Sequence, residues 1–221
     1  NIVYNGKKTV HLSDIIEDVP AISMKGISKE MPWPGSRCGW MEVYNADKDE
    51  VFDQFISAIL NQKMSEVCST TLPQLAIPKL ISHPKYGKYQ DARTSRYERL
   101  SNIAYDIFKD VPYVVANRTN GAFYMSIVFK DSVLNNGQTL SIEQSEIRQY
   151  IEGIVGGEIA LDRRFVYYLL GSTGICVVPL TSFFTPLPGI RITLLEKDEA
   201  RFEFTVKKIA EKIVEYVESS K

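Results

Sequence analysis

A lysine and an arginine lie eight positions apart in one short stretch, residues 26–40, which is rich in glycine and proline. Lys29 follows an apolar run that is typical of a strand, and partial loss of hydration there favours the neutral amine, which is a nucleophile. Arg37 lies in an irregular loop, where its planar guanidinium can donate two parallel hydrogen bonds to a phosphate. The spacing therefore predicts an amine nucleophile near a phosphate-binding arginine.

These two groups together suit a phosphorylated aldehyde, because the amine can attack the carbonyl carbon while the arginine holds the phosphate. Pyridoxal 5'-phosphate is a cofactor of this kind. The spacing also fits a simpler alternative, in which Lys29 and Arg37 are solvated loop cations, since both residue types are common on protein surfaces.

Another arginine lies in an apolar segment, residues 189–194. Strand alternation would place Ile190 and Ile192 on one face of a sheet and Arg191 on the other. A guanidinium in that position could hold a carboxylate through two hydrogen bonds. The alternative is an ordinary half-exposed strand with Arg191 in water.

The elements that would position these residues alternate between strands and helices, which predicts an α/β fold. The clearest helix is residues 202–216, where apolar residues recur at alternate steps of four and three. Pro73 and Pro78 are expected to punctuate the segment after residue 60. The full set of expected elements is strands over 19–24, 40–44, 113–117, 122–129, 175–178 and 190–195, and helices over 51–60, 97–108, 147–154, 165–170 and 202–216.

The composition argues against several classes of protein. The 221 residues contain 26 Lys and Arg against 27 Asp and Glu, for a net charge of -1. This balance is unlike that of a nucleic-acid-binding protein or a polybasic membrane-binding protein. No run approaches the roughly 18 uninterrupted apolar residues of a transmembrane helix. Two histidines and three scattered cysteines do not suit a metal site. We expect a soluble cytoplasmic protein with no metal, nucleic-acid or membrane partner.

Residues 26–40 resemble the lysine signature of the class I/II aminotransferases, the fold type I pyridoxal-phosphate enzymes. The resemblance implies that the Ser28-Lys29 pair binds the cofactor, with Lys29 as the catalytic residue that forms the Schiff base. It also implies that Arg37 binds the cofactor phosphate. Gly26 departs from the family pattern, in which many members have a phosphate-binding serine at this position.

Further segments resemble the same family in the same order. Residues 174–183 resemble the small-domain strand and the loop that approaches the substrate, and residues 189–194 resemble the strand that carries the substrate-binding arginine. The resemblance therefore assigns Arg191 to the α-carboxylate of the substrate. Residues 120–124 resemble the small-domain hairpin, in which Tyr124 is expected to have a structural role.

The resemblance extends over the whole sequence and implies a C-terminal portion of such an enzyme. Residues 1–80 would form a remnant of the large cofactor-binding domain with an interdomain helix, and residues 81–221 the small α/β domain. In the family an Asp-x-x-Tyr segment precedes the lysine, and its aspartate pairs with the pyridine nitrogen. No such segment precedes Lys29 here. We therefore expect a fragment that is inactive as an isolated chain.

The intact enzyme would transfer an amino group between an amino acid of the alanine or aspartate type and a 2-oxo acid, as a homodimer. Three alternatives stay open from the sequence. One is another fold type I enzyme, such as a carbon–sulfur lyase or a decarboxylase, which shares the same lysine and arginine. Another is a non-catalytic module on the same fold, and the last is an unrelated α/β domain with a chance motif.

Overall fold

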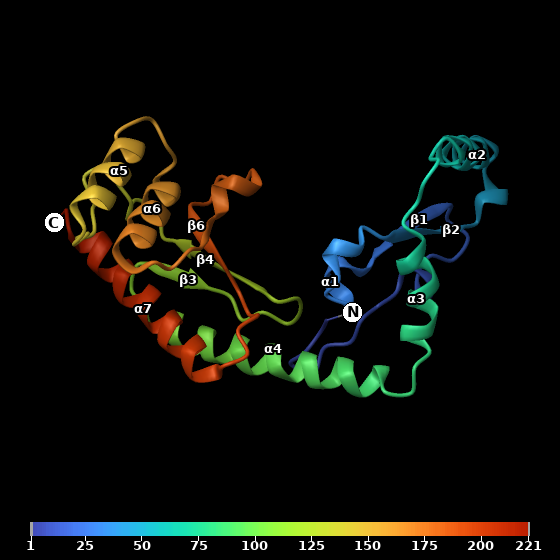
Figure 1. Cartoon of the computed structure of the whole chain (residues 1–221), viewed down its shortest axis with the longest axis horizontal. Coiled ribbons are helices and arrows are strands. Elements are labelled where there is room, and N and C mark those ends of the chain that lie inside the picture. Colours follow the sequence, from blue (N-terminus) through green and yellow to red (C-terminus); the bar gives the residue numbers. More distant parts are fainter. Residues whose placement is uncertain (1, 221) are drawn as a thin grey trace. The chain divides into compact units, whose positions relative to one another are not determined.

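The computed structural model describes residues 2–220. The chain divides into two compact units, Asn1–Ala92 and Arg93–Lys221, and the division falls inside one long helix, α4 (Tyr86–Phe108). The boundary expected from the sequence, after residue 80, falls at the end of the preceding helix. Each unit is described by itself below (Figure 1).

Unit 1 is built around an antiparallel strand pair, and helices follow it in the chain. Both strands lie within two residues of their predicted bounds. The elements in chain order are η1 (Leu12–Asp14), β1 (Ala21–Gly26), α1 (Ile27–Glu30), η2 (Pro34–Ser36), β2 (Gly39–Tyr44), η3 (Ala46–Lys48), α2 (Glu50–Met64), α3 (Thr71–Ile81) and the first part of α4.

The two strands come together at a pair of glycines, Gly26 opposite Gly39. A Cβ atom at position 39 would lie 2.7 Å from the carbonyl oxygen of Lys25. This close approach of two backbones requires glycine. It fixes the point at which the loop that carries Lys29 and Arg37 leaves β1 and returns to β2.

Helix α3 was not predicted from the sequence, because it contains two prolines, which commonly interrupt a helix. Pro73 lies in its first turn, where a backbone N–H has no partner within the helix, so proline is tolerated there. Pro78 lies inside the helix and removes one internal hydrogen bond. The prediction that these prolines only punctuate the segment was therefore wrong, because position within the helix decides the effect of a proline.

Unit 2 contains a four-stranded antiparallel sheet with the order β3-β4-β6-β5. The elements after α4 are β3 (Val114–Ala116), β4 (Tyr124–Phe129), α5 (Ser145–Val155), α6 (Leu161–Thr173), β5 (Val178–Pro179), η4 (Leu180–Phe183), β6 (Gly189–Thr193) and α7 (Glu199–Glu218). Strand β5 has only two residues, and it is shorter than the predicted strand over 175–178. The α/β class predicted from the sequence is confirmed.

The two faces of this sheet differ in burial. On β4, Met125, Ile127 and Phe129 are buried, and the Phe129 ring packs edge-on against Phe165 of α6 at 5.4 Å between ring centroids. Phe165 in turn contacts Tyr216 of α7 at 5.2 Å. The core of unit 2 therefore lies between one face of the sheet and these two helices. Side chains at the alternate positions of β4 and β6 are left partly exposed.

Helix α7 confirms the apolar spacing read from the sequence. Its buried stripe includes Phe202, Val206, Ile209, Ile213 and Tyr216. Among residues 2–220, no helix combines the length and the apolar character needed to cross a membrane. Within the same residues, no group of three or more potential metal-binding side chains comes together.

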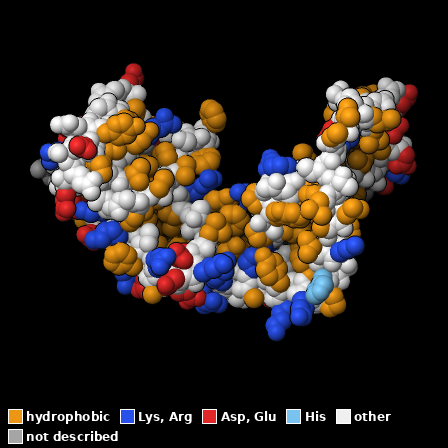
Figure 2. Space-filling view, in the orientation of Figure 1, with side chains coloured by type: hydrophobic (Ala, Val, Ile, Leu, Met, Phe, Trp, Pro, Cys, Tyr) orange, Lys and Arg blue, Asp and Glu red, His pale blue; other side chains and the backbone are white. Residues whose placement is uncertain are grey.

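Hydrophobic side chains also lie on the surface of both units (Figure 2). In unit 1, several large apolar residues of β1, α2, α3 and the loop between these helices are more than three-fifths exposed: Met24, Val51, Met64, Val67, Leu72 and Leu75. Surface of this kind is typical of a face that packs against further protein.

Candidate functional site

Lys29 lies in α1, the single helical turn that follows β1 without a linker. The turn is anchored by Ile27, which is buried, and whose carbonyl oxygen accepts hydrogen bonds from the backbone N–H groups of Met31 (3.2 Å) and Trp33 (3.3 Å). Lys29 itself is exposed, and the neighbouring Ser28 is half-buried. The local backbone therefore presents the amine of Lys29 at the surface of unit 1.

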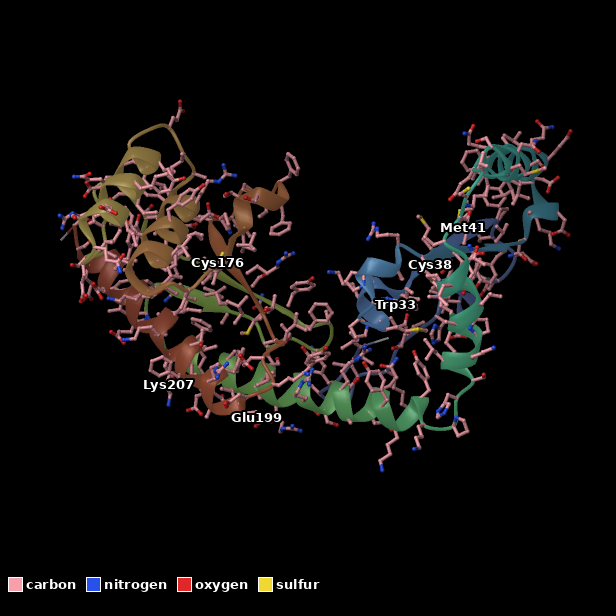
Figure 3. The ribbon with its side chains drawn as sticks, in the orientation of Figure 1. Trp33, Cys38, Met41, Cys176, Glu199 and Lys207 are labelled. Carbon is pink, nitrogen blue, oxygen red and sulfur yellow. The ribbon has the colours of Figure 1, made fainter. Side chains whose placement is uncertain are left out.

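Arg37 adopts a left-handed backbone conformation, with φ of 49°. A residue with a Cβ atom rarely occupies this region, and such conformations concentrate at functional sites. The loop around it is tied internally, because Arg37 Nη1 donates to the carbonyl oxygen of Pro34 (3.0 Å) and Ser36 Oγ donates to that of Trp33 (2.7 Å). Trp33 and Cys38 flank this segment on either side (Figure 3).

Arg37 lines a hollow of about 410 Å³ that also contains Lys63, Ser69 and Thr70. Lys63 donates to Ser69 Oγ (3.0 Å) and pairs with Glu66. Thr70 is the N-cap of α3, and the N-terminal end of a helix favours anions. Glu66 also lines the hollow and neutralises Lys63, so the donors left for a phosphate group are Arg37, the two hydroxyl groups and the helix N-terminus.

The structure thus adds three residues that sequence reasoning missed, Lys63, Ser69 and Thr70. They lie more than twenty positions after Arg37, so no local motif connects them to it. Neither Lys29 nor Ser28 is among the residues that line this hollow.

A carboxylate on β2, Glu42, lies on the same strand pair. It accepts hydrogen bonds from Trp40 Nε1 (3.1 Å) and the hydroxyl of Tyr44 (2.9 Å), and Lys25 Nζ lies 3.8 Å away. The hydrogen bonds from Trp40 and Tyr44, together with the charge of Lys25, lower the pKa of Glu42. The same contact raises the pKa of the Tyr44 hydroxyl. Glu42 is therefore already satisfied by its neighbours, through two hydrogen bonds within β2 and one ion pair with β1.

Arg191 lies on the partly exposed face of the sheet in unit 2, opposite Ser126 of β4 and Val178 of β5. Its guanidinium carbon lies 4.4 Å from the centre of the Tyr124 ring and 4.0 Å from that of Phe183. Tyr124 comes from β4, and Phe183 ends η4. The sequence reasoning gave Tyr124 only a structural role and did not single out Phe183.

The guanidinium of Arg191 has contacts with rings but not with acids. Its Nε is buried, and among residues 2–220 no group accepts a hydrogen bond from it. No ion pair of Arg191 occurs within the same part of the chain. Arg191 also lines a hollow of about 490 Å³ that includes Thr193, Glu196 and Lys197. A buried donor without an acceptor is costly, and this makes Arg191 a candidate for binding an anionic ligand.

Comparison with known proteins identifies the family. Residues 1–209 match the family described as aminotransferase class I and II. The chain is 52% identical over 219 residues to an uncharacterized aminotransferase of Methanocaldococcus jannaschii, covering 99% of this chain and 50% of the relative. It is 30% identical over 151 residues to a tyrosine aminotransferase of Caenorhabditis elegans, covering 67% of this chain and 31% of the relative.

The fold leads to the same family. The structure is similar to that of an alanine aminotransferase from Pyrococcus furiosus with a TM-score of 0.74 and 18% identity, covering 97% of this chain and 47% of that one. The chain thus spans half or less of the length of these relatives. The order of the elements, the matched family and the sequence identity together show that this chain belongs to the class I and II aminotransferases, with the α/β architecture of about half of a fold type I enzyme.

Proposed function

We propose that the chain is the part of a pyridoxal-phosphate-dependent aminotransferase that binds the substrate α-carboxylate through Arg191. The observation that carries the proposal is the guanidinium in contact with the rings of Tyr124 and Phe183, with a buried Nε that no described residue satisfies. The protein would transfer an amino group between an amino acid and a 2-oxo acid, both of which have this carboxylate.

The stacking explains why a carboxylate is the fitting ligand. The guanidinium carbon of Arg191 lies over the rings of Phe183 and Tyr124, at 4.0 and 4.4 Å from their centres, and we propose that a ligand meets the guanidinium along its N–H edge. An approach along that edge is the geometry of a two-point hydrogen bond with a carboxylate. A substrate held in this way cannot rotate freely, and its reacting bond keeps one orientation.

The residues of unit 1 fit the cofactor in their chemistry. Arg37 and the hydroxyl groups around the hollow offer donors to a phosphate, with Lys63 paired to Glu66 beside them, and Ser28 and Lys29 lie in the same segment between β1 and β2 as Arg37. When bound, pyridoxal phosphate supplies an aldehyde that captures amines and a ring that withdraws electrons from the substrate α-carbon. Lys29 would hold the aldehyde until the substrate amine displaces it, and its freed Nζ would then move a proton from the α-carbon as a general base.

The comparisons do not identify the side chain of the substrate, since the similar proteins are named as alanine, aspartate and tyrosine aminotransferases. We propose the alanine or aspartate type on the resemblance of the sequence motifs. We also propose that the 221-residue chain alone transaminates negligibly, because no Asp-x-x-Tyr segment precedes Lys29 within it. The exposed apolar surface of unit 1 supports assembly of the intact protein as a homodimer.

Reductive trapping tests the assignment of Lys29. The full chain is incubated with pyridoxal phosphate, reduced with borohydride and mapped by mass spectrometry. We expect the label on Lys29, and we expect Arg37→Ala to raise the cofactor concentration needed for labelling. Lys48→Ala is the matched control, because Lys48 is also an exposed lysine in unit 1 and lies outside the hollow.

The outcomes separate the parts of the proposal. Equal labelling of Lys29→Ala and the unaltered chain would remove Lys29 from the cofactor site. Robust turnover of alanine or aspartate by the 221-residue chain would refute its proposed inactivity but not its family or its site residues.

A further inference from the structure

Asp162, in the first turn of α6, is a carboxylate with no exposed surface. Its Oδ1 accepts from the backbone N–H of Arg163 (2.8 Å) and from Thr181 Oγ1 (2.6 Å). Its Oδ2 accepts from the backbone N–H groups of Thr181 (3.0 Å) and Gly189 (3.2 Å). Four neutral donors thus satisfy the buried carboxylate, which would otherwise be strongly unfavourable.

The hydrogen bonds to Asp162 join the two ends of one loop. Thr181 and Gly189 are the residues before and after the segment 182–188, and both donate to the same oxygen of Asp162. At Gly189 the fit is close, since a Cβ atom there would lie 2.4 Å from the carbonyl oxygen of Ile127. A further hydrogen bond comes from Arg163 Nη2, which donates to Ser182 Oγ (3.2 Å). The loop is therefore closed at its base by side chains of α6.

This loop carries one of the two rings that hold Arg191. Phe183 lies two residues after Thr181, and its ring centre lies 4.0 Å from the guanidinium carbon of Arg191. The Phe183 side chain is 45% exposed, so burial alone holds it weakly in this place. The next residue, Phe184, adopts a left-handed conformation with φ of 57° and turns the chain away. The position of Phe183 therefore depends on the hydrogen bonds from Thr181 and Gly189 to Asp162, which hold the two ends of the loop together.

We infer that Asp162 is a positioning residue for Arg191: by closing the loop 182–188 it places Phe183 on the guanidinium and fixes the edge that meets the substrate carboxylate. The inference rests on the proposed role of Arg191 for its link to substrate, but the geometric coupling of Asp162 to Arg191 is independent of that role. Asp162 itself acts through Thr181 and Gly189 and is not assigned a contact with substrate.

Nuclear magnetic resonance of the Arg191 side chain tests the coupling in the full 221-residue chain. Aromatic rings shield protons that lie over their faces, so the Arg191 side-chain resonances are expected upfield of those of an exposed arginine. Phe183→Leu removes one ring and provides the reference shift. Asp162→Ala is expected to move the Arg191 resonances to the Phe183→Leu positions, and the double variant is expected to add nothing further.

A conservative variant distinguishes positioning from a general effect on folding. Asp162→Asn keeps a carbonyl oxygen that can accept from Thr181 and Gly189, so it is expected to restore most of the upfield shift. Thr181→Val deletes only the hydroxyl donor and is expected to change the Arg191 shifts in part. This variant provides the test if Asp162→Ala does not fold. Wild-type Arg191 shifts in folded Asp162→Ala, or in Thr181→Val where the alanine variant does not fold, would overturn the inference.

A titration with pyruvate, followed at the same Arg191 resonances, connects the geometry to binding. Asp162→Ala is expected to weaken pyruvate binding about tenfold, the effect of one misplaced hydrogen bond to a charged group. Unchanged pyruvate affinity in Asp162→Ala would refute the functional part of the inference. If the Arg191 shifts follow Asp162 while pyruvate binds to none of the chains, the positioning of Arg191 is confirmed and the proposed binding of a carboxylate by this chain is refuted.

Discussion

Replacing Arg191 by lysine is the sharpest test of the carboxylate site, because it keeps the charge and removes the planar guanidinium with its paired N–H donors. Lysine cannot make the two-point hydrogen bond, and its ammonium group lacks the planar shape of the guanidinium that lies over the rings of Tyr124 and Phe183. Loss of one hydrogen bond to a charged group corresponds to about 1.5–3 kcal/mol. We therefore expect pyruvate or alanine to bind about 10- to 100-fold more weakly to Arg191→Lys.

The same substitution has a smaller effect on folding. Each ring contact of a partly exposed cation contributes about 0.5–1 kcal/mol, and a lysine retains part of it. The unfolding free energy of Arg191→Lys in urea is therefore expected to fall by about 1 kcal/mol or less. Ser126→Ala is the matched control, since Ser126 lies directly opposite Arg191 on β4 and is exposed.

Binding is measured by magnetic resonance titration, which detects the weak complexes expected of a single carboxylate contact. Equal affinity of Arg191→Lys and the unaltered chain would show that the guanidinium does not hold the ligand. The proposed two-point hydrogen bond between Arg191 and a carboxylate would then be refuted. Equal weakening in Ser126→Ala would show that the effect comes from general disturbance of the strand pair.

Three further predictions concern stability, each measured by urea unfolding. Gly189→Ala places a Cβ atom 2.4 Å from the carbonyl oxygen of Ile127, and we expect a loss of about 3 kcal/mol or more; a change below 1 kcal/mol would contradict the close packing. The hydrogen bond from Trp40 lowers the pKa of Glu42, so this stabilisation is present above the ordinary glutamate pKa and is lost as the pH falls through the lower folded value. Glu42→Gln should reduce that acid dependence, and an unaltered pH profile would speak against it. Asp198→Ala removes the N-cap of α7 and should cost about 1 kcal/mol, whereas substitution by Ser should cost little.

Much of the fold could be predicted from residue patterns because its signals are local. The apolar stripe of α7, the strand pair β3–β4 and the short helix α5 follow spacing rules that need no tertiary contact. Helix α3 was missed because Pro78 normally breaks a helix, and only the packing of the folded chain shows that it is tolerated there.

The sequence by itself determined the chemistry that each candidate residue offers and the family to which the order of motifs belongs. Lys29, Ser28 and Arg37 share one loop because they are neighbours in the chain, and β-strand alternation separated Arg191 from the apolar core of its strand. These properties depend on side-chain type and on spacing over a few residues.

Only the tertiary structure decided which distant side chains meet. It placed both Tyr124 and Phe183, fifty-nine positions apart, against the guanidinium of Arg191, and it brought Asp162 to both ends of one loop. It also added Lys63 to the hollow at Arg37. The physical reason is that strand register and helix packing set these distances, and neither is encoded in a local motif.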